Sequence, residues 1–172
     1  MAWPLHALIL TTPDLQLRGM NEADALALAA VRPDDFSVDP DLPSLGFDIE
    51  QSYWRQMGGW RVDDWVMPFT VLHEGAPIGV QALEGKHFAV RRVVDSYSWL
   101  VREARGQGFG KQTRAAVLQL AFQGLGATHA ISEAWDDNAS SLAVSRAMGY
   151  EENGVMVERR DGGVGRTQHV VL

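Results

Sequence analysis

The sequence predicts a mixed α/β domain whose sheet is mostly antiparallel, with one or two helical crossovers in its second half. Short segments rich in strand-forming residues follow one another in the middle of the chain, separated by turn residues. Segments with helical spacing alternate with strands further on. The 172 residues, 46% hydrophobic and 22% charged, can bury one sizeable core. No repeat or linker divides the chain, so we expect a single domain over residues 1–172.

The first third of the chain predicts one strand followed by two helices. Residues 15–18 alternate apolar and polar side chains, as a half-buried strand does. Asn21 is expected to cap a helix with an acidic first turn, which ends before Pro33. Residues 49–57 are expected to form the second helix. The proline- and aspartate-rich residues 33–48 are expected to form a solvated connection, or alternatively a lid whose negative charge attracts an amine.

The remaining elements follow in a regular order. Residues 65–72, 77–83 and 91–101 predict three strands, the first two joined by a hairpin-type turn. Apolar residues at spacings of three and four predict a helix over 109–123, closed by Gly124. We then expect a strand at 129–135, a helix from Asp136 to Gly149, and an antiparallel pair at 154–159 and 165–172.

Three glycines at alternate positions, Gly106, Gly108 and Gly110, join the third of these strands to the following helix. Small residues let a ligand approach the backbone, and the amides and dipole of a helix start attract anions. The spacing fits neither of the two common nucleotide-binding loops. The phosphate loop of nucleoside triphosphatases requires a glycine at position 105, which is Arg105, and the dinucleotide-binding loop requires its last glycine at position 111, which is Lys111. Spacing alone therefore allows either a phosphate site or a plain structural turn.

Two segments carry a resemblance to a known family. Arg105-Gly106-Gln107-Gly108-Phe109-Gly110 matches the Gln/Arg-x-x-Gly-x-Gly/Ala signature of the GNAT superfamily of acyl-CoA N-acyltransferases. Residues 137–150 resemble its Asn-x-x-Ser…Gly-Phe/Tyr segment, in the form typical of the ribosomal-protein alanine acetyltransferase (RimJ/RimL-like) branch. Residues 12–18 also resemble that branch's first strand. The resemblance implies a GNAT-like fold, in which a mixed, mostly antiparallel central sheet is flanked by helices and acyl-CoA lies in a cleft at the central strand.

The resemblance also implies a reaction and its residues. A neutral amine attacks the thioester of acetyl-CoA directly in a ternary complex, and no metal takes part. The implied cofactor-binding residues are Leu100 and Val101 for the pantetheine arm, Arg105, Gly106, Gln107, Gly108, Phe109, Gly110 and Lys111 for the pyrophosphate, and Asn138 and Ser141 near the pantetheine and the sulfur. Ser141 would protonate the leaving thiolate. Asn138 is equally a helix N-cap, and a serine such as Ser141 is common in a first helical turn.

The general base is left open by the sequence. Glu133 and Glu84 are the first candidates and Asp95 is the third, because a carboxylate on a strand can face a cleft. Each is also an ordinary surface acid. Tyr150 is expected to be a core aromatic residue. The histidines show no metal-ligand spacing, so we expect no metal.

Composition limits the partners. A net charge of −7 and a pI near 5.1 argue against a nucleic-acid binder and favour cationic partners such as amines. No stretch is long and apolar enough to span a membrane, and we expect a cytoplasmic protein. The acceptor could be a small amine or a protein N-terminus or lysine. The sequence is also compatible with succinyl-CoA as the donor, with a homodimer, and with a non-catalytic acyl-CoA-binding or sensing module.

Overall fold

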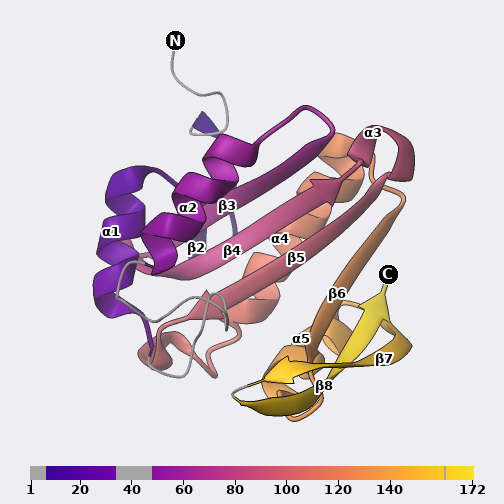
Figure 1. Ribbon diagram of the computed structural model, residues 1–172. Coiled ribbons are helices and arrows are strands. Elements are labelled where there is room, and N and C mark those ends of the chain that lie inside the picture. Colours follow the sequence, from indigo (N-terminus) through magenta and orange to yellow (C-terminus); the bar gives the residue numbers. More distant parts are fainter. Residues whose placement is uncertain (1–6, 34–47, 161) are drawn as a thin grey trace.

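The computed structural model describes residues 7–33, 48–160 and 162–172. Its centre is an eight-stranded sheet with the order β1-β2-β3-β4-β5-β6-β8-β7 (Figure 1). The strands are β1 (Ile9–Thr11), β2 (Leu15–Gly19), β3 (Asp64–His73), β4 (Ala76–Lys86), β5 (Val93–Leu100), β6 (His129–Trp135), β7 (Glu151–Arg160) and β8 (Gly163–Val171). All neighbours are antiparallel except β5 and β6, which are parallel. The expected mixed, mostly antiparallel sheet is confirmed.

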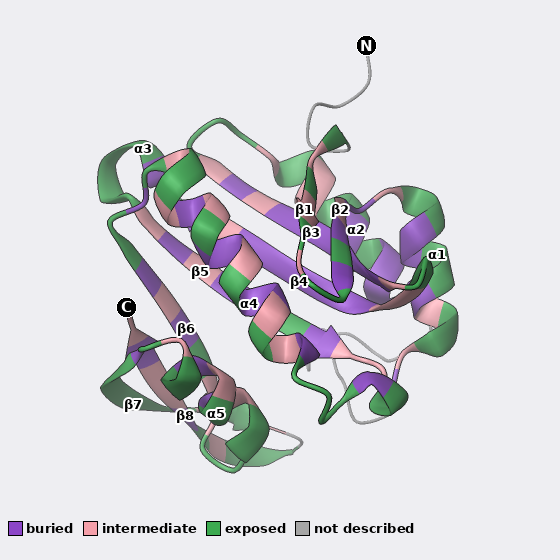
Figure 2. Cartoon of the chain, turned by 180° about the vertical axis from the view of Figure 1, so that it is seen from behind, coloured by how far each residue is buried: buried purple, intermediate pink, exposed green. Residues whose placement is uncertain are grey.

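Helices cover both faces of the sheet. They are α1 (Glu22–Val31), α2 (Asp48–Gly59), α3 (Phe88–Arg91), α4 (Phe109–Gln119) and α5 (Ala139–Ala147), with a 3₁₀ turn η2 (Arg102–Ala104) and a π-helical turn η3 (Leu120–Leu125). Helices α1 and α2 lie on one face, and α4 and α5 lie on the other (Figures 1 and 2). We call these the α2 face and the α4 face. None of the described helices combines the length and the apolar character needed to cross a membrane.

The side chains of β5 alternate between two hydrophobic clusters. Val94 belongs to the larger cluster, which includes the buried face of α4, and Trp99 belongs to the smaller cluster beneath α1 and α2. Because successive residues point to opposite faces, Asp95 and Tyr97 lie on the α2 face and Ser96 lies on the α4 face.

The start of α1 follows the expected capping pattern. The Asn21 side chain accepts a hydrogen bond from the Asp24 amide (3.0 Å), and the Asp24 carboxylate accepts one from the Asn21 amide (3.2 Å). Arg18 of β2 donates to the same carboxylate at 2.5 Å. The helix ends at Val31, two residues before Pro33.

Several expectations about boundaries are wrong. The strand expected over residues 77–83 continues to Lys86, and the strand expected from residue 154 begins at Glu151. The strand expected from residue 91 begins at Val93, because residues 88–91 form α3 between two left-handed residues, His87 (φ 52°) and Arg92 (φ 53°). The helix expected to close at Gly124 continues as η3 and ends at left-handed Gly126 (φ 72°). The helix expected from Asp136 begins at Ala139.

The acidic connection before α2 is only partly described. Asp48, expected in a solvated segment, instead begins α2, is buried, and accepts an ion-paired hydrogen bond from Arg32. This pair ties the start of α2 to the end of α1. Residues 34–47, and with them the expected lid, lie outside the described residues.

Candidate functional site

The parallel strands β5 and β6 pair over only three residues each. The register runs from Val93–His129 to Asp95–Ile131, whereas β5 continues to Leu100 and β6 to Trp135. Figure 1 shows the two strands side by side near α3 and well apart at their C-terminal ends. We call the region beyond the Asp95–Ile131 pair the fork. No other described strand pairs with β5 on this side, so its backbone edge is open there.

Strand geometry identifies the backbone groups that face the fork. On the β6 side, the Arg92 carbonyl accepts a hydrogen bond from the Thr128 amide at 2.8 Å. Alternate residues of a strand direct their N–H and C=O groups to the same side, so Ser96, Ser98 and Leu100 face the fork as well. An extended chain that carries amide groups can pair with such an edge as a strand would. The pantetheine arm of coenzyme A is a chain of this kind.

The structure already pairs most backbone groups of Leu100 and Val101, the two residues assigned to pantetheine from the sequence. The Leu100 carbonyl accepts a hydrogen bond from Arg105 Nε (3.0 Å). The Val101 amide donates to the Ile78 carbonyl (2.9 Å), and the Val101 carbonyl accepts from the Ala104 amide (3.1 Å). The unpaired edge is centred two residues earlier, at Ser98. Sequence reasoning missed Ser98, because the side to which a residue directs its backbone depends on strand pairing.

The glycine turn presents an open row of backbone amides. Gly106 and Gly108 have φ values of 77° and 84°, and a Cβ atom at either position would meet nothing within 4 Å. No described residue accepts a hydrogen bond from the amides of Gly106 through Gly110. The first amide used within the helix is that of Lys111, which donates to the Gly108 carbonyl at 3.1 Å. These unpaired amides at a helix start suit an anion such as a diphosphate.

Charged side chains surround the same turn. Arg102, Arg105 and Lys111 are all exposed and lie within ten residues of one another in the chain. Gln107 donates to the Glu103 carbonyl at 2.7 Å, which fixes the start of the turn. The turn therefore combines amide donors with an excess of positive charge, although the whole protein is acidic.

The buried side of this turn holds it against the rest of the molecule. Phe109 is buried and its ring centroid lies 4.8 Å from that of His73, so only its backbone faces the open side. A Cβ atom on Gly110 would lie 3.5 Å from Val144 of α5. This contact brings the first turn of α4 close to α5, the helix that carries the second sequence motif.

The two motif residues of α5 take the structural roles that the sequence also allows. Asn138 is the N-cap, and its side-chain oxygen accepts from the Ser141 amide (3.1 Å) and from the Ser140 hydroxyl (2.9 Å). Its side-chain NH₂ group donates to no described residue and is available to a ligand. Ser141 is half-buried in the first turn of the helix.

Three carboxylates come together on the α2 face at the fork. Glu84 is the register partner of Asp95 on β4, and Glu133 lies two residues beyond Ile131, the partner of Asp95 on β6. Alternation places all three on one face. Glu133 is about half exposed and lies 3.4 Å from the His169 ring nitrogen. The structure thus unites all three bases considered from the sequence, and no described group of three or more histidines or acids could hold a metal ion.

Asp95 is the carboxylate whose acidity is most altered. Burial raises its pKa to about 7, and the charges of Glu84 and Glu133 act in the same direction. The Ser96 amide, which donates to Asp95 at 2.6 Å, and the Arg114 charge oppose the rise. Burial also raises the pKa of Glu84, helped by the charge of Glu133. A carboxylate that titrates near neutral pH can accept a proton and release it again.

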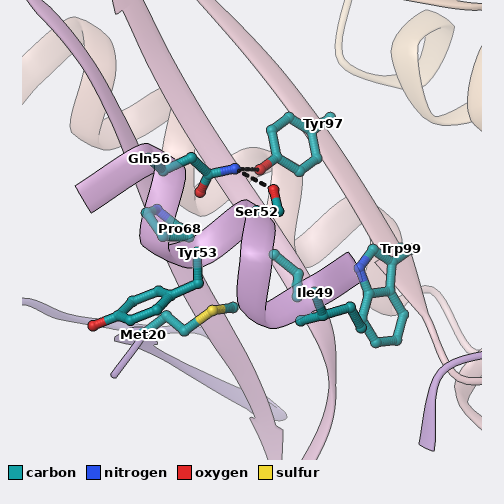
Figure 3. A pocket seen from close by; sticks show the side chains of 9 residues that line it. Met20, Ile49, Ser52, Tyr53, Gln56, Pro68, Tyr97 and Trp99 are labelled. Atoms are coloured by element: carbon teal, nitrogen blue, oxygen red, sulfur yellow. Dashed lines mark hydrogen bonds between the residues drawn. The ribbon is translucent and has the colours of Figure 1, made fainter. Parts of the chain in front are cut away.

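A small pocket lies between α2 and the sheet (Figure 3). Its volume is about 30 Å³, and it is lined by Met20, Ile49, Ser52, Tyr53, Gln56, Pro68, Val80, Tyr97 and Trp99. Gln56 donates to the Tyr97 hydroxyl (2.8 Å) and to the Ser52 hydroxyl (2.9 Å). Burial raises the pKa of Tyr97 to about 12, so this hydroxyl stays protonated at neutral pH. Tyr97 lies two residues from Asp95 on the same face, which makes the pocket and the carboxylates neighbours.

Comparison with known proteins agrees with this geometry. A family model described as an acetyltransferase (GNAT) domain matches residues 14–151. Among solved structures, RimJ of Mycobacterium smegmatis in complex with CoA-disulfide is 21% identical with a TM-score of 0.75, covering 96% of this chain and 85% of that one.

Two further structures have the same architecture. RimL, a ribosomal L7/L12 α-N-protein acetyltransferase in complex with coenzyme A, is 16% identical with a TM-score of 0.75, covering 96% of this chain and 97% of that one. A chimera of the spermidine N-acetyltransferase SpeG from Vibrio cholerae and hSSAT is 16% identical with a TM-score of 0.77, covering 92% and 95%. At these identities the likeness shows the shared fold.

Proposed function

Because the chain belongs to the acetyltransferase (GNAT) domain family, we propose that it transfers the acetyl group of acetyl-CoA to the nitrogen of an amine. The observation that carries this proposal is the fork together with the glycine turn. The open edge of β5 leads directly to a turn whose amides have no partner among the described residues. One extended ligand with an anionic end would satisfy both groups of donors and acceptors.

Each part of acetyl-CoA has residues that fit it. The diphosphate would be held by the amides of Gly106 through Gly110, with Arg105 and Lys111 supplying charge. The pantetheine arm would pair with the open edge at Ser98, with the Asn138 side chain as a further donor. The open space over Gly106 and Gly108 supports this fit, because no described atom lies within 4 Å of either Cβ position and a ligand can approach the backbone there.

When bound, acetyl-CoA supplies a thioester whose carbonyl carbon accepts a nucleophile. Asp95 takes up the proton that the amine must lose, since its pKa near 7 suits a base at neutral pH. Glu84 and Glu133 give the α2 face a negative potential that attracts a protonated amine. Ser141 presents its hydroxyl proton to the leaving sulfur.

The pocket beneath α2 indicates the kind of amine. Its walls are mostly apolar, and Tyr97 in its wall lies two residues from Asp95 on the same face of β5. An amine that carries a positive charge next to an apolar group would place the charge on the carboxylates and the apolar group in the pocket. RimL acts on a protein α-amine and SpeG acts on spermidine, so we propose a primary amine and keep both classes in the test.

The test compares two glycines with the same backbone strain. Gly108 (φ 84°) lies in the turn, whereas Gly75 (φ 83°) lies in the β3–β4 hairpin, and neither has an atom within 4 Å of the Cβ position. Gly108→Ala and Gly75→Ala should each cost about 1 kcal/mol of stability, because alanine disfavours this conformation. Only Gly108→Ala should weaken acetyl-CoA binding, by roughly tenfold or more, since its methyl group takes up open space that the diphosphate would need to reach the backbone of the turn.

Calorimetric titrations with CoA, acetyl-CoA and succinyl-CoA measure this binding and compare the acyl donors. Turnover is then assayed with an alkylamine, a polyamine, a peptide α-amine and a peptide lysine. Acetyl-CoA binding together with acetylation of one of these classes supports the proposal. Binding without turnover on any amine would identify an acyl-CoA-binding module instead. No binding, or equal binding by both alanine variants, would overturn the assignment of the turn.

A further inference from the structure

A buried arginine lies on the α4 face at the fork. Arg114, in the second turn of α4, is 3% exposed, and no described carboxylate forms an ion pair with it. Taking a guanidinium group out of water costs several kcal/mol when no carboxylate compensates. An apolar side chain at this inward position would avoid that cost. Stability therefore gives no reason for an arginine here.

Arg114 begins a chain of hydrogen bonds that crosses the fork. Its Nη1 donates to the Ser132 hydroxyl of β6 at 3.2 Å, and that hydroxyl donates to the Ser96 carbonyl of β5 at 3.2 Å. The Ser96 amide donates in turn to the Asp95 carboxylate at 2.6 Å. The chain starts on the α4 face and ends at a carboxylate on the α2 face. It connects β6 to β5 just where their backbone pairing stops.

Further buried polar atoms lie around these hydrogen bonds. Three buried polar atoms near these hydrogen bonds, Arg114 Nε, Ser96 Oγ and the Tyr150 hydroxyl, make no hydrogen bond of good geometry within the described part of the chain. Arg114 and Ser96 nevertheless interact with the Tyr150 hydroxyl, and both oppose the rise in its pKa that burial causes. The Arg114 guanidinium carbon lies 6.0 Å from the centroid of the Tyr150 ring. Buried groups without partners are rare in folded proteins. A polar cluster of this kind, around a buried cation that forms no ion pair with a described carboxylate, favours a role in the reaction over a role in packing.

We propose that Arg114 is a positioning residue for the transfer reaction, acting on the carboxylate of Asp95 through Ser132 and Ser96 and through its own charge. This inference rests on the proposed function, in which Asp95 accepts the proton of the amine. The charged groups that act on Asp95 are Glu84 on β4, Glu133 on β6 and Arg114 on α4. Arg114 is the cation among them, and it opposes the rise in the pKa of Asp95 that burial causes. Without it, less of the base is ionised at neutral pH.

The experiment follows the titration of Asp95 directly, by the carboxyl ¹³C signal of the ligand-free protein. Arg114→Met should raise the titration midpoint by about one pH unit, which leaves roughly tenfold less ionised base at a pH below both midpoints. At pH 7, the parent's own midpoint, the ionised fraction falls from about one half to about one tenth, so kcat should fall about fivefold, with KM for acetyl-CoA unchanged within twofold and activity recovering at higher pH. Arg114→Lys, which keeps the charge, should restore the midpoint.

The matched control is Arg146→Met on α5, which removes an exposed arginine and should leave the midpoint unchanged. If Arg114→Met does not fold, Ser132→Ala decides instead, because it breaks the hydrogen-bond chain and keeps the charge. A raised midpoint in either folded variant supports the inference, and an unchanged midpoint in both overturns it. The titration needs no ligand, so its outcome is separate from that of the acetyl-CoA titrations, which test the proposed function.

Discussion

If Asp95 is the general base, the rate of acetyl transfer should depend on pH. Its pKa of about 7 means that the ionised base accumulates as pH rises through neutrality, so kcat/KM should rise along a limb centred near pH 7. Asp95→Asn should abolish this limb and lower kcat/KM roughly 10²- to 10⁴-fold. A pH–rate profile of both proteins measures this.

Glu133 supplies the comparison, because it was the first base considered from the sequence. If Asp95 is the base, Glu133→Gln keeps the limb and moves it to lower pH, since the charge of Glu133 raises the pKa of Asp95. If Glu133 is the base, its glutamine variant loses the limb and the Asp95→Asn protein retains it.

The same residue gives a prediction for stability. The pKa of Asp95 is near 4 in an unfolded chain and about 7 in the folded protein, so the folded state binds this proton more tightly. Its contribution to stability is complete below about pH 4 and is lost as pH rises through 7. The free energy of unfolding of Asp95→Asn should therefore fall less between pH 5 and pH 8 than that of the parent protein. Urea denaturation at both values measures the difference, and parallel changes would show that Asp95 titrates normally.

Among the elements, β4 and β5 approach most closely at Gly79. A Cβ atom there would lie 2.2 Å from the Trp99 carbonyl oxygen and 2.9 Å from the Leu100 Cα. Gly79→Ala must therefore displace the end of β5, and we expect a loss of about 1–3 kcal/mol, typical of overpacking, together with weaker acetyl-CoA binding. Gly58→Ala in α2, where the Cβ position is open, should cost no stability. Denaturation and calorimetry test both variants, and an undisturbed Gly79→Ala protein would contradict the close approach.

The elements also show which features the sequence could predict. Most of the order of strands and helices was predictable because the periodicities of 15–18 and 109–123 are local. The short elements β1 and α3 were not predicted, since three or four residues carry too little periodicity. The glycine turn was equally visible, since Gly106 and Gly108 identify their own backbone conformation. The position where β5 stops pairing with β6 could not be predicted, because register is set by contacts between residues far apart in the chain.

The candidate catalytic residues illustrate the same limit. Glu84, Asp95 and Glu133 could each be named as an acid on a strand, but only the register of three strands places them on one face. Arg114 appeared only as a residue of a helix, and nothing local indicates that it is buried beside Ser132. The N-cap role of Asn138 could be assigned from the sequence, because an N-cap acts on residues three positions away.

On the scale of the whole molecule, the net charge of −7 should attract a positively charged amine acceptor and speed its association. The carboxylates at the fork add a local negative potential, so a polyamine should associate faster at low ionic strength. We expect kcat/KM for a polyamine to fall severalfold between about 0.01 and 0.15 M salt. The kcat/KM for an amine with a single amino group and no other charge should fall less. Initial rates at a fixed acetyl-CoA concentration measure this. A rise with salt would argue against a cationic acceptor.

The last strand of the sheet has a consequence for handling the protein. No described strand covers the outer edge of β7, and its residues Val155, Met156 and Val157 are 45%, 53% and 67% exposed. An exposed edge of this kind can pair with a strand of another molecule, and electrostatic repulsion between the negatively charged molecules opposes this association. That repulsion vanishes near pH 5.1, the isoelectric point. Concentrated stocks should therefore cloud on mild acidification and clear again in alkaline buffer.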